Sequence, residues 1–232
     1  MKILALDTAT EACSAALWID GQILERETEV ERGHAELILA MIDEVLSESG
    51  TALTGLDAIA FGRGPGSFTG VRLAASVTQG LAFGADVPVV PISDLRAVAQ
   101  RVLIHSSGVA VRHVLVCNDA RMNEVYWACF ERGRDDLMVH AGTERVSKPL
   151  EVQLPPGWTH TAIDAAGRGF RAYPELRGNL GLHLTRILPD LLPSASEIAR
   201  LAAVDVMAGQ MLPAEQAVPV YLRDDVARPK AS

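Results

Sequence analysis

The order of hydrophobic segments in the first 105 residues constrains the fold of this chain more than any other feature. Apolar runs and periodicity predict three strands, a helix, a strand, a second helix, a strand and a third helix. In chain order, these segments are residues 3–8, 12–19, 22–30, 34–49, 56–61, 67–83, 87–92 and 94–103. Asp20-Gly21, between the second and third strands, suits the positive φ angles of a tight hairpin turn. The order therefore predicts an α/β domain in which an antiparallel hairpin precedes helical crossover units.

The second half of the chain predicts a smaller and less regular lobe. Ser106, Ser107 and Gly108 indicate a boundary near residue 105, which divides the chain into lobes of residues 1–105 and 106–232. The predicted segments of the second lobe are strands at 112–117, 124–131, 139–146 and 159–164 and a helix at 196–208. Antiparallel strands followed by crossover units are typical of the ribonuclease-H-like and actin-like α/β folds.

Composition excludes several classes of function. Hydrophobic residues make up 49% of the 232 residues and charged residues 22%, which is typical of a folded protein. The net charge of −8 argues against direct binding of nucleic acid by the chain alone, because phosphates require clustered Lys and Arg. The longest apolar runs are far shorter than the ~20 residues that span a bilayer. The N-terminal apolar run ends at Asp7, too early for a signal peptide. We therefore expect a cytoplasmic protein without a membrane segment.

Cysteines and histidines do not form a metal-binding pattern. The chain has three cysteines, Cys13, Cys117 and Cys129, without C-x-x-C spacing, which predicts buried free thiols. Its six histidines show neither H-x-x-x-H nor H-E-x-x-H spacing, so no metal site is predicted.

Two predicted helices are more apolar than one buried face requires. Apolar side chains of helix 34–49 cover an arc of roughly 200°, whereas a surface helix needs roughly 100°. Helix 67–83 is apolar almost all round, with Arg72 as its only charge. We therefore predict a partner-docking surface that comprises His34, Leu37, Ile38, Leu39, Met41, Ile42, Val45, Phe68, Val71, Arg72, Ala74, Ala75, Thr78 and Ala82. The alternative is that the second helix is central in its own chain and covered on both sides.

The glycine-rich segment at 62–70 leads from a predicted strand into the second helix. Backbone N–H groups at such a helix start can hold an anion. Together with the turn after the first strand, this predicts an anion or nucleotide site made of Asp7, Thr8, Gly64, Gly66 and Ser67. The segment lacks the Lys of a Walker loop, and Thr69 replaces the third glycine of a dinucleotide-binding loop. The alternative is a tight turn in which Ser67 caps the helix.

Four sequence blocks resemble the TsaB (YeaZ) family. In chain order, the blocks are residues 3–10 (ILALDTAT), 64–72 (GPGSFTGVR), 119–126 (DARMNEVY) and 219–224 (PVYLRD). They extend from the N-terminus to the last ten residues, and the glycine-rich block is highly specific.

The resemblance implies a two-lobed actin-like (ASKHA) fold and a role in forming N6-threonylcarbamoyladenosine (t6A) at position 37 of tRNAs that read codons beginning with A. It implies a non-catalytic subunit that supports a TsaD-like transferase together with a TsaE-like ATPase. By this resemblance, tRNA would be reached only through the complex, and the chain could form a homodimer when alone. The chain alone would bind no cofactor, although ATP or ADP could lie at the complex interface.

The catalytic paralogue carries an H-x-x-x-H motif after the strand that follows its second helix. Asp94 and Val98 stand at the corresponding positions of this chain, and Val98 cannot bind a metal. The resemblance therefore implies that the catalytic metal is absent. One alternative is an ATP-dependent phosphotransferase of the sugar-kinase type that uses Asp7 and the loop at 64–69. Another is a metalloprotease, for which the histidine spacing provides no support.

Overall fold

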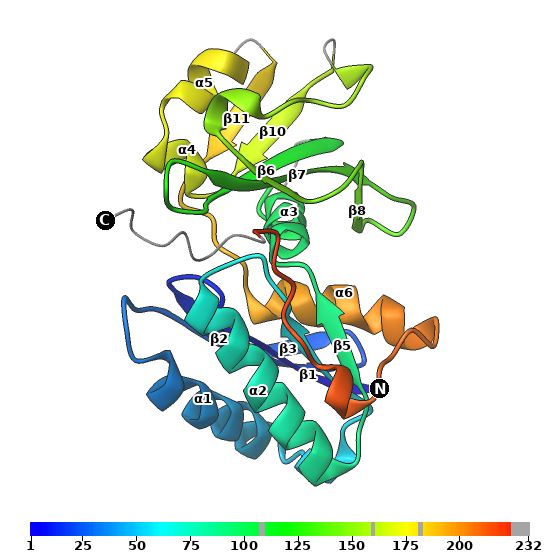
Figure 1. Ribbon diagram of the computed structural model, residues 1–232. Helices are drawn as coiled ribbons and strands as arrows, with labels where there is room; N and C mark the ends of the chain where they lie inside the picture. Colours follow the sequence, from blue (N-terminus) through cyan, green and yellow to red (C-terminus); the bar gives the residue numbers. More distant parts are fainter. Residues whose placement is uncertain (107–109, 159–160, 181–182, 224–232) are drawn as a thin grey trace, which may run out of the picture.

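The chain folds into two α/β lobes, one above the other in Figure 1. This computed structural model describes residues 1–106, 110–158, 161–180 and 183–223. Each lobe is built on one mixed sheet whose two faces are both covered by packed side chains.

The strands of the first sheet follow one another along the chain in the predicted order. Its strands are β1 (Lys2–Asp7), β2 (Ala12–Ile19), β3 (Gln22–Glu29), β4 (Ala58–Gly62) and β5 (Val89–Ile92). They lie in the order β3-β2-β1-β4-β5, with β1, β2 and β3 antiparallel and β4 and β5 parallel to β1. Asp20 and Gly21 have φ angles of 47° and 96°, so Ile19 pairs with Gln22 across a tight turn. The predicted hairpin is confirmed.

Helices cover both faces of the first sheet. They are α1 (His34–Ser49) and α2 (Phe68–Ala85) on one face and α6 (Ala195–Met207) on the other. Strand β1 shows why both faces are apolar, because successive side chains of a strand point to opposite faces. Leu4 and Leu6 pack in the cluster that contains α1 and α2, whereas Ile3 and Ala5 pack in the cluster that contains α6.

The second sheet is also mixed. Its strands are β6 (His113–Asp119), β7 (Val125–Arg132), β8 (Met138–His140), β9 (Arg145–Ser147), β10 (Ile163–Ala166) and β11 (Leu184–Leu188). They lie in the order β11-β10-β6-β7-β8, and β9 also pairs with β7. The single strand predicted at 139–146 is wrong, because Gly142 with φ 130° separates β8 from β9. Residues 159 and 160 of another predicted strand lie outside the described residues.

The helices of the second lobe also cover opposite faces. They are α3 (Asp94–Ile104), α4 (Gly169–Ala172) and α5 (Glu175–Leu180). Leu95 and Val98 of α3 pack against one face, whereas Phe170 of α4 and Leu176 of α5 pack against the other. Two sheets of this topology with crossover helices form the actin-like (ASKHA), ribonuclease-H-like fold predicted above.

The lobe boundary at residue 105 requires two corrections. Helix α3 packs on the second sheet, so the second lobe begins before residue 105. Helix α6 packs on the first sheet, and Leu212 exchanges backbone hydrogen bonds of 2.8 and 2.9 Å with Val89. The physical reason is burial: α6 contributes the Ala and Leu side chains that cover the second face of the first sheet. The first lobe is therefore built from both ends of the chain.

The three cysteines are free and buried, as predicted. Burial raises the pKa of Cys13 to about 11 and that of Cys129 to about 12, and it raises the pKa of Cys117 as well. Thiols with raised pKa values are poor nucleophiles at neutral pH. Within the described residues, no helix is both long enough and apolar enough to cross a membrane.

Candidate functional site

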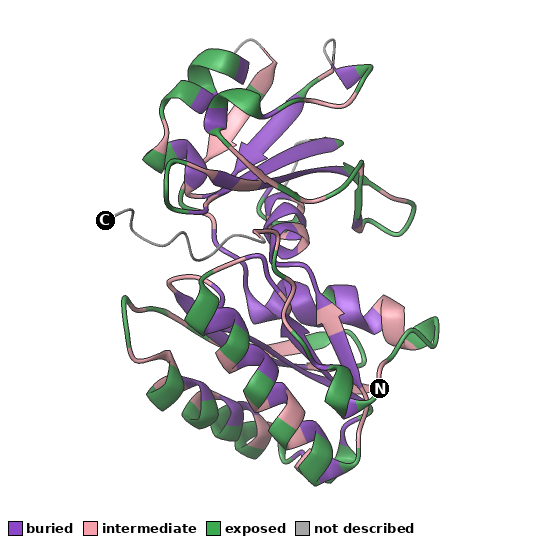
Figure 2. Cartoon of the chain, viewed as in Figure 1, coloured by how far each residue is buried: buried purple, intermediate pink, exposed green. Residues whose placement is uncertain are grey.

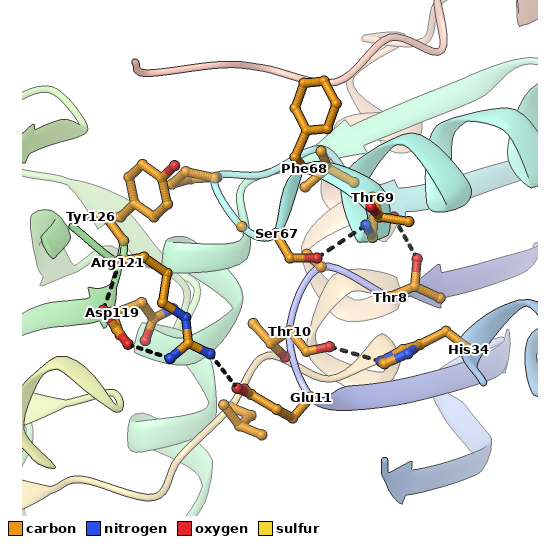
Figure 3. Close-up of a pocket in the computed structure, with 18 of the residues that line it drawn as sticks. Thr8, Thr10, Glu11, His34, Ser67, Phe68, Thr69, Asp119, Arg121 and Tyr126 are labelled. Carbon is orange, nitrogen blue, oxygen red and sulfur yellow. Dashed lines mark hydrogen bonds and ion pairs between the residues drawn. The ribbon is translucent and has the colours of Figure 1, made fainter. Parts of the chain in front are cut away.

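A cleft of about 970 Å³ lies between the two lobes. The first lobe lines it with the turn after β1, the loop before α2 and the start of α1. The second lobe contributes residues 118–121, Tyr126 and Arg168, and the C-terminal residues 220–223 complete the lining. Figure 3 shows how side chains from both lobes converge on this space.

Ser67 begins α2 in the manner of an N-cap residue. It has an extended backbone, and its Oγ accepts a hydrogen bond from the Gly70 N–H at 3.0 Å. Such a bond satisfies one of the N–H groups that a helix start leaves without a helical partner. The capping interpretation of Ser67 is therefore confirmed.

The loop before α2 packs directly on the turn after β1. The Ser67 N–H donates to the Ala9 carbonyl oxygen at 2.7 Å, and the Thr8 hydroxyl donates to the Gly70 carbonyl oxygen at 2.7 Å (Figure 3). A Cβ at Gly66 would lie closer than 3.0 Å to the Ala9 carbonyl oxygen, and a Cβ at Gly70 would crowd Thr8 in the same way. Both glycines are therefore required by the close approach of two backbone segments.

The five residues predicted to bind an anion lie around this contact, and polar groups of Asp7, Thr8, Gly64 and Ser67 form hydrogen bonds with other parts of the chain. Besides the bonds of Thr8 and Ser67, Asp7 Oδ1 accepts from the Ala9 N–H at 2.9 Å. The Gly64 N–H donates to Asp94 Oδ2. These bonds hold the loop against the turn after β1 and against Asp94.

Asp94 and Val98, which stand where the paralogue has its histidines, lie in different surroundings. Val98 is fully buried among apolar side chains of the second lobe. Asp94 is also fully buried, and its carboxyl group lies beside Gly62 together with that of Asp7. In the part of the chain that the structure describes, no three His, Cys, Asp or Glu residues are grouped so that they could hold a metal ion.

Ion pairs connect the two lobes across the cleft. Glu11 of the first lobe lies 3.0 Å from Arg168 and 3.5 Å from Arg121 of the second lobe. Arg168 also pairs with Glu29, and Arg121 pairs with Asp119 at 3.0 Å. Figure 3 shows Arg121 between Asp119 and Glu11. Sequence reasoning did not find this network, since its members lie far apart in the chain.

The C-terminal segment forms part of the rim of the cleft. The Val220 N–H donates to the Arg63 carbonyl oxygen at 2.7 Å. Arg72 Nε donates to the Tyr221 hydroxyl oxygen at 2.7 Å, and its guanidinium carbon lies 3.6 Å from the centre of the Phe68 ring. This cation–π and hydrogen-bond cluster holds the segment against the start of α2.

Burial divides the predicted partner-docking residues into two groups (Figure 2). Eight of them are buried in the chain's own core: Ile38, Ile42, Val45, Val71, Ala74, Ala75, Thr78 and Ala82. Their assignment to a contact surface is wrong, because the first sheet and the segment around residues 212–217 cover them. Exposed or half-buried members are His34, Leu37, Leu39, Met41, Phe68 and Arg72. The alternative that α2 is covered on both sides by its own chain is wrong, because only its inner face is buried and Phe68 and Phe83 remain exposed.

An apolar strip remains exposed on the outer sides of α1 and α2. Leu39 of α1 is 55% exposed, and Phe68 and Phe83 of α2 are 47% and 60% exposed. Gly80 and Gly84 lie on α2 with open space on the side where a Cβ would project, so a second backbone could approach them. We call Leu39, Phe68, Arg72, Gly80 and Phe83 the outer strip. The sequence prediction omitted Phe83, although its place in the same apolar helix pointed to it.

Comparison with known proteins identifies the family. Residues 26–230 match the family described as TsaD, tRNA N6-adenosine threonylcarbamoyltransferase. The Escherichia coli protein TsaB is 42% identical over 98% of this chain and 96% of its own length, and the Haemophilus influenzae TsaB is 39% identical over 97% and 95%. Both are described as tRNA threonylcarbamoyladenosine biosynthesis proteins.

Solved structures agree with this result. A Pseudomonas aeruginosa protein described as similar to peptidase YEAZ superimposes with a TM-score of 0.88 at 42% identity, covering 96% of this chain and 99% of that chain. YeaZ from Pseudomonas aeruginosa superimposes with a TM-score of 0.86 at 40% identity, with coverage of 95% and 99%. The chain belongs to the TsaB (YeaZ) family of tRNA threonylcarbamoyladenosine biosynthesis proteins.

Proposed function

We propose that this chain is a non-catalytic subunit that binds a TsaD-like transferase through the outer strip of α1 and α2. The exposed strip is the observation that carries the proposal, because large exposed apolar side chains on two neighbouring helices are typical of a surface that another protein covers. Small residues on α2 would let a partner helix approach closely. The complex would form t6A at position 37 of tRNAs that read codons beginning with A, with a TsaE-like ATPase as its third protein.

The cleft supports a role without chemistry of its own. The turn after β1 and the loop before α2 are hydrogen-bonded to each other, and the cleft arginines Arg121 and Arg168 are paired with acidic side chains. We therefore expect no nucleotide or metal to bind the isolated chain tightly. ATP or ADP would be held only where this chain and the transferase meet.

Charge supports an indirect relation to tRNA. With a net charge of −8, the chain would rely on the other subunits to bind the phosphate backbone. We propose that the complex acts in the cytoplasm, which is consistent with three buried free thiols.

A reconstituted modification reaction tests the proposal. Purified TsaD-like and TsaE-like proteins, threonylcarbamoyl-adenylate and unmodified tRNA are combined with and without this chain, and t6A is measured after nuclease digestion. We expect t6A to form only in its presence. Equal modification without the chain would show that the accessory role is wrong.

The outer strip could also be covered by a second copy of the chain when no transferase is present. Sedimentation of the protein alone measures self-association, and sedimentation with the transferase measures binding of the transferase. If the strip forms both contacts, Leu39→Glu will remove any self-association together with transferase binding. If Leu39→Glu removes self-association alone, the transferase binds elsewhere and the proposed docking face is incorrect.

A further inference from the structure

Two buried carboxyl groups, those of Asp7 and Asp94, meet beside Gly62. Asp7 stands at the end of β1 and Asp94 at the start of α3, 87 positions later in the chain, and neither has any exposed surface. A Cβ on Gly62 would lie closer than 3.0 Å to oxygen atoms of both carboxyl groups. Glycine at this position therefore leaves the space in which the two groups meet.

The hydrogen bonds of this pair leave one oxygen of each carboxyl group without a partner in the part of the chain that the structure describes. Asp7 Oδ1 accepts from the Ala9 N–H, and Asp94 Oδ2 accepts from the Gly64 N–H. Asp7 Oδ2 and Asp94 Oδ1 are buried and have no hydrogen-bond partner among the described residues. An oxygen of each carboxyl group lies within 2.5 Å of the point that a Gly62 Cβ would occupy, so the two groups lie close together. A hydrogen bond between two carboxyl groups requires that one of them carry a proton.

The surrounding charges do not neutralise two carboxylates. The positive charge of Arg63 opposes the rise in the pKa of Asp94 that burial causes, and His34 acts in the same direction on Asp7. The Cys13 thiol is neutral, because burial raises its pKa to about 11. Arg63 is already paired with Glu144 at 3.0 Å. Burial raises the pKa of both carboxyl groups, and the charge of Asp7 raises the pKa of Asp94 further. Two buried like charges in contact would otherwise repel each other strongly.

We propose that Asp7 and Asp94 share one proton at neutral pH, with Asp94 as the acid that donates to the Asp7 carboxylate. The shared proton ties the turn after β1 to the loop that begins α2, because Asp7 holds Ala9 and Asp94 holds Gly64. The loop then places Ser67 and the first turn of α2. This inference does not depend on the proposed role in tRNA modification.

Amide substitutions test the shared proton directly. In Asp94→Asn the amide oxygen can accept from the Gly64 N–H while the amide N–H donates to the Asp7 carboxylate. In Asp7→Asn the amide oxygen can accept from the Ala9 N–H while the amide N–H donates to the Asp94 carboxylate. We expect each single variant to be at least as stable as the wild-type chain at pH 8. The double variant places two NH₂ groups face to face, so it should lose far more stability than the single changes sum to.

The pH dependence of the unfolding free energy provides a second test of the shared proton. Between the ordinary Asp value of 3.8 and the raised pKa of Asp94, the folded chain holds one more proton than the unfolded chain. The wild-type unfolding constant should therefore rise about tenfold per pH unit relative to Asp94→Asn within that window. Parallel stability curves for the two proteins would overturn the proposal.

Infrared spectroscopy reports the proton itself. The carbonyl stretch of a protonated carboxylic acid should be present at pH 8 and disappear in Asp94→Asn but not in the exposed control Asp20→Asn. All proteins in this measurement also carry Glu197→Gln. Burial raises the pKa of Glu197 to about 7, so this carboxylic acid would contribute a similar band. Absence of the band, or stabilisation by added Mg²⁺ that Asp94→Asn abolishes, would overturn the shared proton in favour of two carboxylates.

Discussion

The Thr8 hydroxyl donates a buried hydrogen bond to the Gly70 carbonyl oxygen at 2.7 Å, and so joins the end of β1 to the first turn of α2. This contact is possible only because Gly70 has no side chain. It brings the two backbone segments together at the wall of the cleft. The same contact sets the position of α2, which carries most of the outer strip.

Gly70→Ala should destabilise the chain strongly. Its methyl group would meet the Thr8 backbone and the Ser67 hydroxyl at less than 3.0 Å. We expect a loss of about 2–3 kcal/mol or more in the free energy of unfolding, measured by urea denaturation. Gly80→Ala is the matched control, because nothing lies within 4 Å of its Cβ and helix propensity should stabilise it by about 0.5–1 kcal/mol. Equal effects of the two substitutions would contradict the close approach.

Glu197→Gln should change how stability varies with pH. Burial raises the pKa of Glu197 to about 7 from 4.5, so the folded chain retains a proton that the unfolded chain releases in this interval. Wild-type stability should therefore fall, relative to Glu197→Gln, as pH rises from 4.5 to about 7. The difference should reach about 2–3 kcal/mol in thermal or urea unfolding. The exposed control Glu175→Gln should show the same dependence of the unfolding free energy on pH as the wild-type chain. If Glu197→Gln also showed the wild-type dependence, the raised pKa of Glu197 would be refuted.

Arg168→Met should weaken the connection between the lobes. Arg168 is 22% exposed and pairs with both Glu11 and Glu29, so its removal should cost about 1 kcal/mol at low ionic strength and less in high salt. Arg171→Met is the control, since Arg171 is 67% exposed and its pair with Asp190 lies at the surface. If both variants unfold alike at every salt concentration, the inter-lobe network contributes no stability.

Arg72→Ala should loosen the C-terminal segment. Without the guanidinium between Phe68 and Tyr221, we expect the Val220 amide, bonded to Arg63, to exchange about three- to tenfold faster with deuterium. Arg145→Ala provides the control, because Arg145 stacks on Trp127 in the second lobe. An unchanged exchange rate at Val220 in Arg72→Ala would show that other contacts hold the segment.

Local sequence patterns predicted the first sheet well because its strands and helices follow one another in chain order. The Asp20-Gly21 turn and the Ser67 cap depend on neighbouring residues alone, and both were predicted. The placement of α6 on the first sheet was not, since periodicity reveals an apolar face without revealing what it packs on.

The same limit explains the docking prediction. The apolar arc of α2 includes side chains such as Val71 and Ala74 that the chain itself buries, so composition could not separate the inner face from the outer strip. The Asp7–Asp94 pair was equally hidden, because nothing in the local sequence around either residue indicates that they meet.

Calorimetric titration of this chain with a TsaD-like transferase tests the central claim most directly. Leu39→Glu places a charge in the outer strip, whereas Leu150→Glu alters a leucine of similar exposure, 66%, in the second lobe. We predict at least about tenfold weaker binding for Leu39→Glu and wild-type affinity for Leu150→Glu. Wild-type affinity for Leu39→Glu, with the variant folded, would contradict the assignment of α1 and α2 as the docking face.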